Sequence, residues 1–156
     1  MNKINVFALA ALLSTATVAA HAEAPTPAAA ATAEIEKTFG FVPGFVRAFP
    51  QALLAVWWDA EKSLELNPAT ALSGKQKELI GLAVAAQIPC DYCVYFHTQA
   101  ARLNGATDQE IQEAVGMAAL TRLGSTVLNG LQVDQAGFRK DVDHVVKNVR
   151  AGQAKK

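Results

Sequence analysis

Apolar residues recur at helical spacing along most of this chain, and that periodicity constrains the fold more than any other feature. From Pro50 onward they lie three and four positions apart, as on one face of an amphipathic helix. No segment of useful length alternates between apolar and polar residues as a half-buried strand does. The sequence therefore predicts an all-α protein, a bundle of about six to seven helices.

Capping sequences mark several helix starts. Ser73 with Gln76, and Thr107 with Glu110, are two capping boxes, in which each side chain binds the other residue's main-chain N–H. Asp134 is predicted to begin the last helix. That helix carries apolar residues on one face, at Phe138, Val142, Val145, Val146 and Val149.

Proline and glycine mark the other boundaries. Pro89 is expected to interrupt a helix, and a new helix is predicted from Cys90 to Leu103. The next helix is predicted to run to about Arg122. A short separate helix is then expected where Gly124 and Gly130 interrupt the pattern.

The N-terminus has the features of a secretory signal. Lys3 precedes an apolar run from Ile4 to Val18, and Ala20-His21-Ala22 supplies the small residues of a cleavage site. The run is shorter than the ~20 residues that span a bilayer. The prediction is a signal peptide over residues 1–22, cleavage near Ala22, a periplasmic protein and no membrane contact after cleavage.

The remaining chain is divided by composition. Residues 23–33 are rich in proline and alanine and are predicted to be a linker. Residues 34–150 are predicted to form a single helical domain, and 151–156 a solvated tail. The formal net charge of the whole chain is zero, with no basic block, which argues against a nucleic-acid partner.

Two cysteines and a histidine share one face of the helix predicted after Pro89. Cys90 and Cys93 are three positions apart and Cys93 and His97 four, so all three side chains project together. A helix N-terminus favours a thiolate, and a nearby imidazole can take the thiol proton. The pattern indicates a reactive dithiol that needs no metal and no cofactor.

Glu78 is a candidate fourth member of this site. Pro89 allows the two helices to fold back and bring Glu78 beside the cysteines, where burial would raise the pKa of its carboxyl. The alternative is a surface position among Lys75 and Lys77. Spacing alone does not separate these readings.

Two other interpretations of the cysteine cluster stay open. A zinc site could use Cys90, Cys93 and His97 with Glu78 as the fourth ligand, although this helical spacing is less typical of structural zinc. A passive disulfide is the other, but a bridge that closes so short a loop constrains the unfolded chain little.

The combination of Glu78, Cys90-x-x-Cys93-x-x-x-His97 and Gly105-Ala106-Thr107-x-x-Glu110 resembles the carboxymuconolactone decarboxylase superfamily, and within it the alkylhydroperoxidase D-like branch. The resemblance spans about Leu72 to Gly124. It implies an all-helical fold, assembly as a homotrimer or homohexamer, and a thiol peroxidase that acts on hydroperoxides. Decarboxylases of the superfamily lack the cysteine pair.

The resemblance also implies residue roles. Cys93 would be the thiolate that attacks the peroxide, Cys90 the resolving thiol, and Glu78 and His97 members of a proton relay. The family archetype has a histidine immediately before its second cysteine, where this chain has Tyr92, a candidate auxiliary residue. An exported protein would take electrons from a periplasmic dithiol donor, as yet unidentified.

Three functions follow as hypotheses. The first is a hydroperoxide-reducing enzyme that forms a Cys90–Cys93 disulfide. The second is a periplasmic thiol–disulfide oxidoreductase, and the third a non-catalytic helical oligomer. A scaffold has no need of Glu78 and His97, so the sequence favours the first two.

Overall fold

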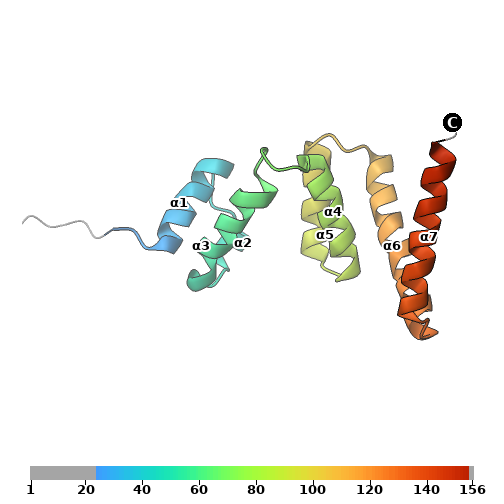
Figure 1. Cartoon of the computed structure of the whole chain (residues 1–156). Coiled ribbons are helices and arrows are strands. Elements are labelled where there is room, and N and C mark those ends of the chain that lie inside the picture. Colours follow the sequence, from blue (N-terminus) through green and yellow to red (C-terminus); the bar gives the residue numbers. More distant parts are fainter. Residues whose placement is uncertain (1–23, 155–156) are drawn as a thin grey trace, which may run out of the picture. The chain divides into compact units, whose positions relative to one another are not determined.

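The computed structural model describes residues 24–154, and the predicted signal peptide with its cleavage site lies outside this range. The described chain contains seven α-helices, one π-helix and no strand, which confirms the all-α prediction (Figure 1). It forms two compact units, one ending at Trp58 and one beginning at Asp59. The N-terminal helices form a core of their own, and both units overlap the range 34–150 that the sequence predicts as a single domain.

Helix α1 spans Pro27–Phe39, so most of the segment predicted as a linker over 23–33 is helical. The Thr26 hydroxyl caps the helix by accepting the N–H of Ala29 at 3.2 Å, and Pro27 suits the first helical turn. The alanines that suggested a linker are strong helix formers, and small enough for Ala28 to be buried.

The first unit is built around Trp58. Its ring is 1% exposed, its indole N–H donates to Glu34 Oε2 at 2.9 Å, and the ring of Phe39 lies edge-on at 5.7 Å. The core is completed by side chains from α1, from the one-turn helix α2 (Gly44–Arg47) and from α3 (Gln51–Ala60). Its buried members are Ala28, Ala31, Ile35, Val46, Leu54 and Trp58.

The second unit begins as α3 ends and continues directly into a π-helix, η1 (Glu61–Glu65). Helix α4 (Gly74–Gln87) packs against α5 (Asp91–Leu103) and α6 (Asp108–Gly130). Both predicted capping boxes are present, at the starts of α4 and α6. Glu78 lies on α4, Cys93 and His97 lie on α5, and Cys90 precedes α5, so these two helices carry the residues that the sequence predicts as a site.

Helix α6 runs without interruption to Gly130, so the separate short helix predicted near Gly124 does not exist. Glycine weakens a helix by only about 1 kcal/mol, which the flanking helix formers can offset. Helix α7 (Gln135–Gln153) starts where predicted, with the Asp134 carboxylate accepting the N–H groups of Ala136 and Gly137. It continues into the segment predicted as a tail from residue 151.

Among residues 24–154, no helix combines the length and the apolar character required to cross a membrane.

Candidate thiol site

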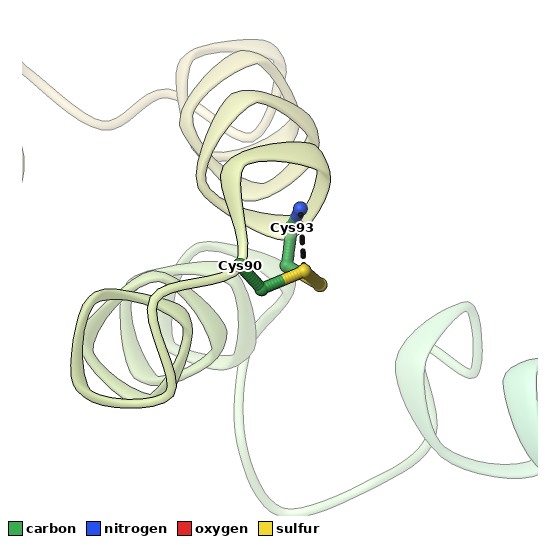
Figure 2. Close-up of a disulfide and its surroundings, with 2 residues drawn as sticks. All are labelled: Cys90 and Cys93. Carbon is green, nitrogen blue, oxygen red and sulfur yellow. Dashed lines mark hydrogen bonds between the residues drawn. A yellow bond between two sulfur atoms is a disulfide. The ribbon is translucent and has the colours of Figure 1, made fainter.

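The turn between α4 and α5 places a disulfide at the start of a helix. Ile88 ends α4, and Pro89 has no N–H with which to extend it. The N–H of Cys90 returns to the carbonyl of Ala85 at 3.1 Å, which closes the turn. Cys90 and Cys93 are then joined in a disulfide with their Cα atoms 5.3 Å apart (Figure 2).

Cys90 is the N-cap residue of α5. Its Sγ accepts the main-chain N–H of Cys93 at 3.2 Å, the dashed contact in Figure 2. An N-cap sulfur faces unpaired N–H groups and the positive end of the helix dipole, both of which stabilise a thiolate when the disulfide is open. Cys93 lies within the first turn of the same helix and, like Cys90, is half-buried.

Glu78 and His97 form a buried hydrogen-bonded pair between α4 and α5. His97 Nδ1 lies 2.8 Å from Glu78 Oε2, and the Glu78 residue is only 4% exposed. Burial raises the pKa of the Glu78 carboxyl, and its hydrogen bond with His97 opposes that rise. The other ring nitrogen of His97 is not used by this bond, and Cys93 lies one helical turn before it.

Gly81 provides the space that His97 occupies, a role that sequence reasoning missed. A Cβ built at Gly81 would lie 2.6 Å from Nδ1 and 2.8 Å from Nε2 of the imidazole. Gly81 follows Glu78 by three residues, so both lie on the face of α4 that meets α5. In the sequence, the only sign of this role is a glycine one helical turn after the candidate acid Glu78. The sign can be interpreted only when the helix that packs against it is known.

Glu65 is a second residue that sequence reasoning missed. It lies at the end of η1, and one carboxylate oxygen of Glu65, one of Glu78 and one ring nitrogen of His97 all lie within 4.8 Å of one another. In sequence it stands 13 positions before Glu78, in a segment without an evident motif. The hydrogen bonds of Lys77 to the carbonyls of Leu64 and Asn67 hold the end of η1, and with it Glu65, beside α4.

The surface alternative for Glu78 does not hold, because the neighbouring lysines have other partners. Lys75 Nζ binds Glu110 Oε1 at 2.7 Å, and its hydrogen bond lowers the pKa of Glu110. Lys77 Nζ donates to the carbonyls of Leu64 and Asn67, each at 2.7 Å. Lys75 therefore links α4 to α6, and Lys77 links α4 to the end of η1. Neither lysine pairs with Glu78 at the surface.

The alternative zinc ligand set is not assembled in this disulfide state. Each cysteine sulfur is bonded to the other, so neither is a free thiolate ligand. The His97 nitrogen that faces the carboxylates is engaged by Glu78 at hydrogen-bond distance. This arrangement suits proton exchange among neighbouring groups.

Tyr92 lies between the two cysteines in sequence but not at the buried pair. It is 90% exposed, whereas Phe96 packs edge-on against the His97 ring with centroids 5.3 Å apart. The structure thus brings Glu78 and His97 together on one side of the disulfide helix and leaves Tyr92 at the surface.

Comparison with known proteins identifies relatives of this arrangement. The carboxymuconolactone decarboxylase family matches residues 43–136. The crystal structure of an alkylhydroperoxidase core from Rhodospirillum rubrum superposes with a TM-score of 0.62 at 30% sequence identity, covering 72% of this chain and 86% of that one.

One curated relative also matches. The uncharacterized protein 4 in the cox locus of Paracoccus denitrificans is 42% identical over 55 residues. This alignment covers 35% of the present chain and spans half the length of that relative.

Proposed function

Because the chain belongs to the carboxymuconolactone decarboxylase family and to its alkylhydroperoxidase D-like branch, we propose that it is a thiol-dependent peroxidase that reduces hydroperoxides. One observation carries the proposal. A disulfide lies at the N-terminal end of helix α5. The same helix carries His97, which is hydrogen-bonded to the buried Glu78. A dithiol, a base and an acid of raised pKa are the groups that such a reduction needs.

In the proposed reaction Cys93 is the attacking thiolate. Its proton passes to His97, whose bond to Glu78 holds the ring in place and stabilises the imidazolium. The sulfur attacks the hydroperoxide, so that an S–O bond forms and the O–O bond breaks. The departing alkoxide takes the proton back and leaves as an alcohol, while Cys93 becomes a sulfenic acid.

Cys90 then resolves the sulfenic acid. Its N-cap position favours the thiolate, which attacks Cys93 Sγ, forms the disulfide and expels hydroxide, released as water after protonation. The two sulfurs together lose two electrons, which a dithiol donor must return. We propose that this donor is a periplasmic dithiol, in keeping with the secretory features of residues 1–22.

Peroxide consumption by the purified protein tests the proposal. With a dithiol such as DTT in excess, steady loss of hydrogen peroxide or cumene hydroperoxide is expected, and the Cys90→Ser/Cys93→Ser double variant should show only the uncatalysed rate. Loss of peroxide at the same rate with both proteins would contradict the proposal.

The N-cap position of Cys90 supports a second candidate, a thiol–disulfide oxidoreductase. In Cys-x-x-Cys proteins that exchange disulfides, the cysteine at the helix N-terminus is the usual nucleophile. Reduction of the disulfide of insulin, compared with turnover of peroxide under the same conditions, separates the two activities.

A homo-oligomeric state is also proposed. The apolar face of α7 is unburied in the single chain, with Phe138 44%, Val142 43%, Val145 60%, Val146 41% and Val149 53% exposed. Apolar surface of this extent favours association with another copy.

A further inference from the structure

Glu65 has a buried carboxylate oxygen that lacks a hydrogen-bond donor. Its Oε1 is inaccessible to solvent and has no hydrogen-bond partner among the residues that the structure describes. Leaving a charged oxygen in this condition destabilises the folded state, so such an atom calls for an explanation. The site described above makes no use of it.

The position of Glu65 is fixed from α4. Lys77, the residue before Glu78, donates from Nζ to the carbonyls of Leu64 and Asn67, on either side of the end of η1. A cation that binds the last carbonyls of a helix also complements the negative end of its dipole. Lys77 therefore anchors the end of η1, and the next residue of α4, Glu78, lies close to Glu65.

The carboxyl groups of Glu65 and Glu78 lie close to each other and to His97. One oxygen of each carboxyl group and one ring nitrogen of His97 lie within 4.8 Å of one another, and Glu78 is buried. Two carboxylates in such a site repel each other, and one proton held between them removes the repulsion. A proton on Glu78 would also supply the donor that Glu65 Oε1 lacks.

We propose that Glu65 is a positioning residue of the thiol site, which shares one proton with Glu78 and thereby keeps that proton beside His97. The role in turnover rests on the proposed peroxidase function. The sharing itself concerns only Glu65, Glu78 and His97.

The shared proton allows the carboxyl pair to stabilise the positive charge that forms on His97 during the reaction. When Cys93 loses its proton to His97, the carboxyl pair beside the imidazole can rearrange its own proton so that negative charge faces the ring. When the alkoxide or hydroxide leaves, the proton returns from His97 and the pair resumes its former state. No proton is gained or lost by the pair over one cycle.

Charged and titratable groups approach the pair from α4 and α5. His97 faces it from α5, and Cys93 lies one turn earlier on that helix. Lys77 approaches from α4, with its ammonium against the main chain of η1. Burial is the largest cause that raises the pKa of Glu78, and the negative charge of Glu65 raises it further.

Carbon NMR of the protein labelled with ¹³C-carboxyl glutamate tests the sharing without any peroxide present. The Glu78 signal is assigned by its loss in Glu78→Gln. In the wild type the midpoint of its titration is expected above the ordinary value of 4.5, and Glu65→Gln should lower that midpoint measurably. Glu65→Asp should restore it.

Glu113→Gln is the matched control, since it removes one carboxylate from an exposed site on α6 that contacts Gln109. This control should leave the Glu78 midpoint where it is in the wild type. The proposal is overturned if Glu65→Gln leaves the midpoint unchanged, or if Glu113→Gln moves it equally. Should Glu65→Gln not fold, a wild-type Glu78 midpoint at 4.5 overturns it as well.

The peroxidase proposal can fail independently. If the wild-type protein shows the coupled titration but consumes no peroxide, the shared proton is supported and the peroxidase function is contradicted. If peroxide is consumed, the acid limb of the rate–pH profile should move in Glu65→Gln in the same direction as the NMR midpoint. A profile that falls uniformly at all pH values would indicate a structural role and reject the positioning one.

Discussion

The imidazole of His97 lies so close to Gly81 that the site has no room for a side chain there: a Cβ at this position would lie 2.6 Å from Nδ1. This is the nitrogen that is hydrogen-bonded to Glu78. The glycine on α4 therefore determines how the histidine on α5 meets its acid partner.

Gly81→Ala should displace His97 and disrupt its bond to Glu78. If His97 acts in proton transfer, peroxide reduction should fall on the order of 10²-fold, while both thiols remain present. Gly116→Ala, at an α6 glycine with nothing within 4 Å of an added Cβ, is the control and should keep the wild-type rate. Equal peroxidase rates for Gly81→Ala and Gly116→Ala would argue against a role for the His97 position.

The raised pKa of Glu78 makes folding stability depend on pH. The folded state holds this proton more tightly than the unfolded chain, whose carboxyl has the ordinary pKa of 4.5. The stabilisation is therefore fully present below pH 4.5 and is lost as the pH rises through the folded-state pKa.

Urea unfolding at several pH values measures this dependence. The free energy of unfolding of the wild type should decline above pH 4.5 more steeply than that of Glu78→Gln, which cannot ionise there. Parallel curves for the two proteins would show that Glu78 has the same pKa in the folded and unfolded states.

Reduction of the disulfide should leave the fold intact. A bridge between residues three positions apart closes a loop so short that its entropic stabilisation is about 2 kcal/mol or less. Thermal melts followed by circular dichroism should therefore differ by only a few degrees between the oxidised and DTT-reduced protein. A large loss of helicity on reduction would instead identify the bridge as a structural staple.

The exposed face of α7 predicts self-association. Light scattering should give a mass that is a multiple of the chain mass, with a trimer or hexamer expected. Val145→Glu places a charge on this face and should reduce that mass, while Lys147→Gln on the same exposed helix should not. A monomeric wild type would remove the basis of this prediction.

Local sequence signals determined much of the fold. The capping boxes at Ser73 and Thr107, and Asp134 before the last helix, marked helix starts correctly because these side chains bind main-chain groups within their own turn. Residues 27–33 lie in α1 although the sequence predicted a linker there, because an alanine-rich segment has little apolar surface while alanine itself favours helix. The predicted break near Gly124 is absent because a single glycine costs a helix too little to end it.

The candidate site was only partly predictable. Cys90, Cys93 and His97 belong to one helical face, and their common location follows from spacing alone. The burial of Glu78 depends on α5 folding back against α4 at Pro89. The sequence is compatible with that packing but does not require it. No local pattern indicated Glu65, which meets Glu78 from another helix. The glycine one turn after Glu78 was visible in the sequence, but its contact with His97 depends on how α5 packs.

Trapping of the sulfenic acid tests the central claim most directly. Reduced Cys90→Ser protein should consume about one equivalent of hydroperoxide and form a dimedone adduct on Cys93, because only Cys93 lies one turn from His97. Reduced Cys93→Ser protein should form little adduct. Peptide mass mapping that finds the adduct on Cys90 in Cys93→Ser, and none on Cys93 in Cys90→Ser, would contradict the assignment and favour disulfide exchange.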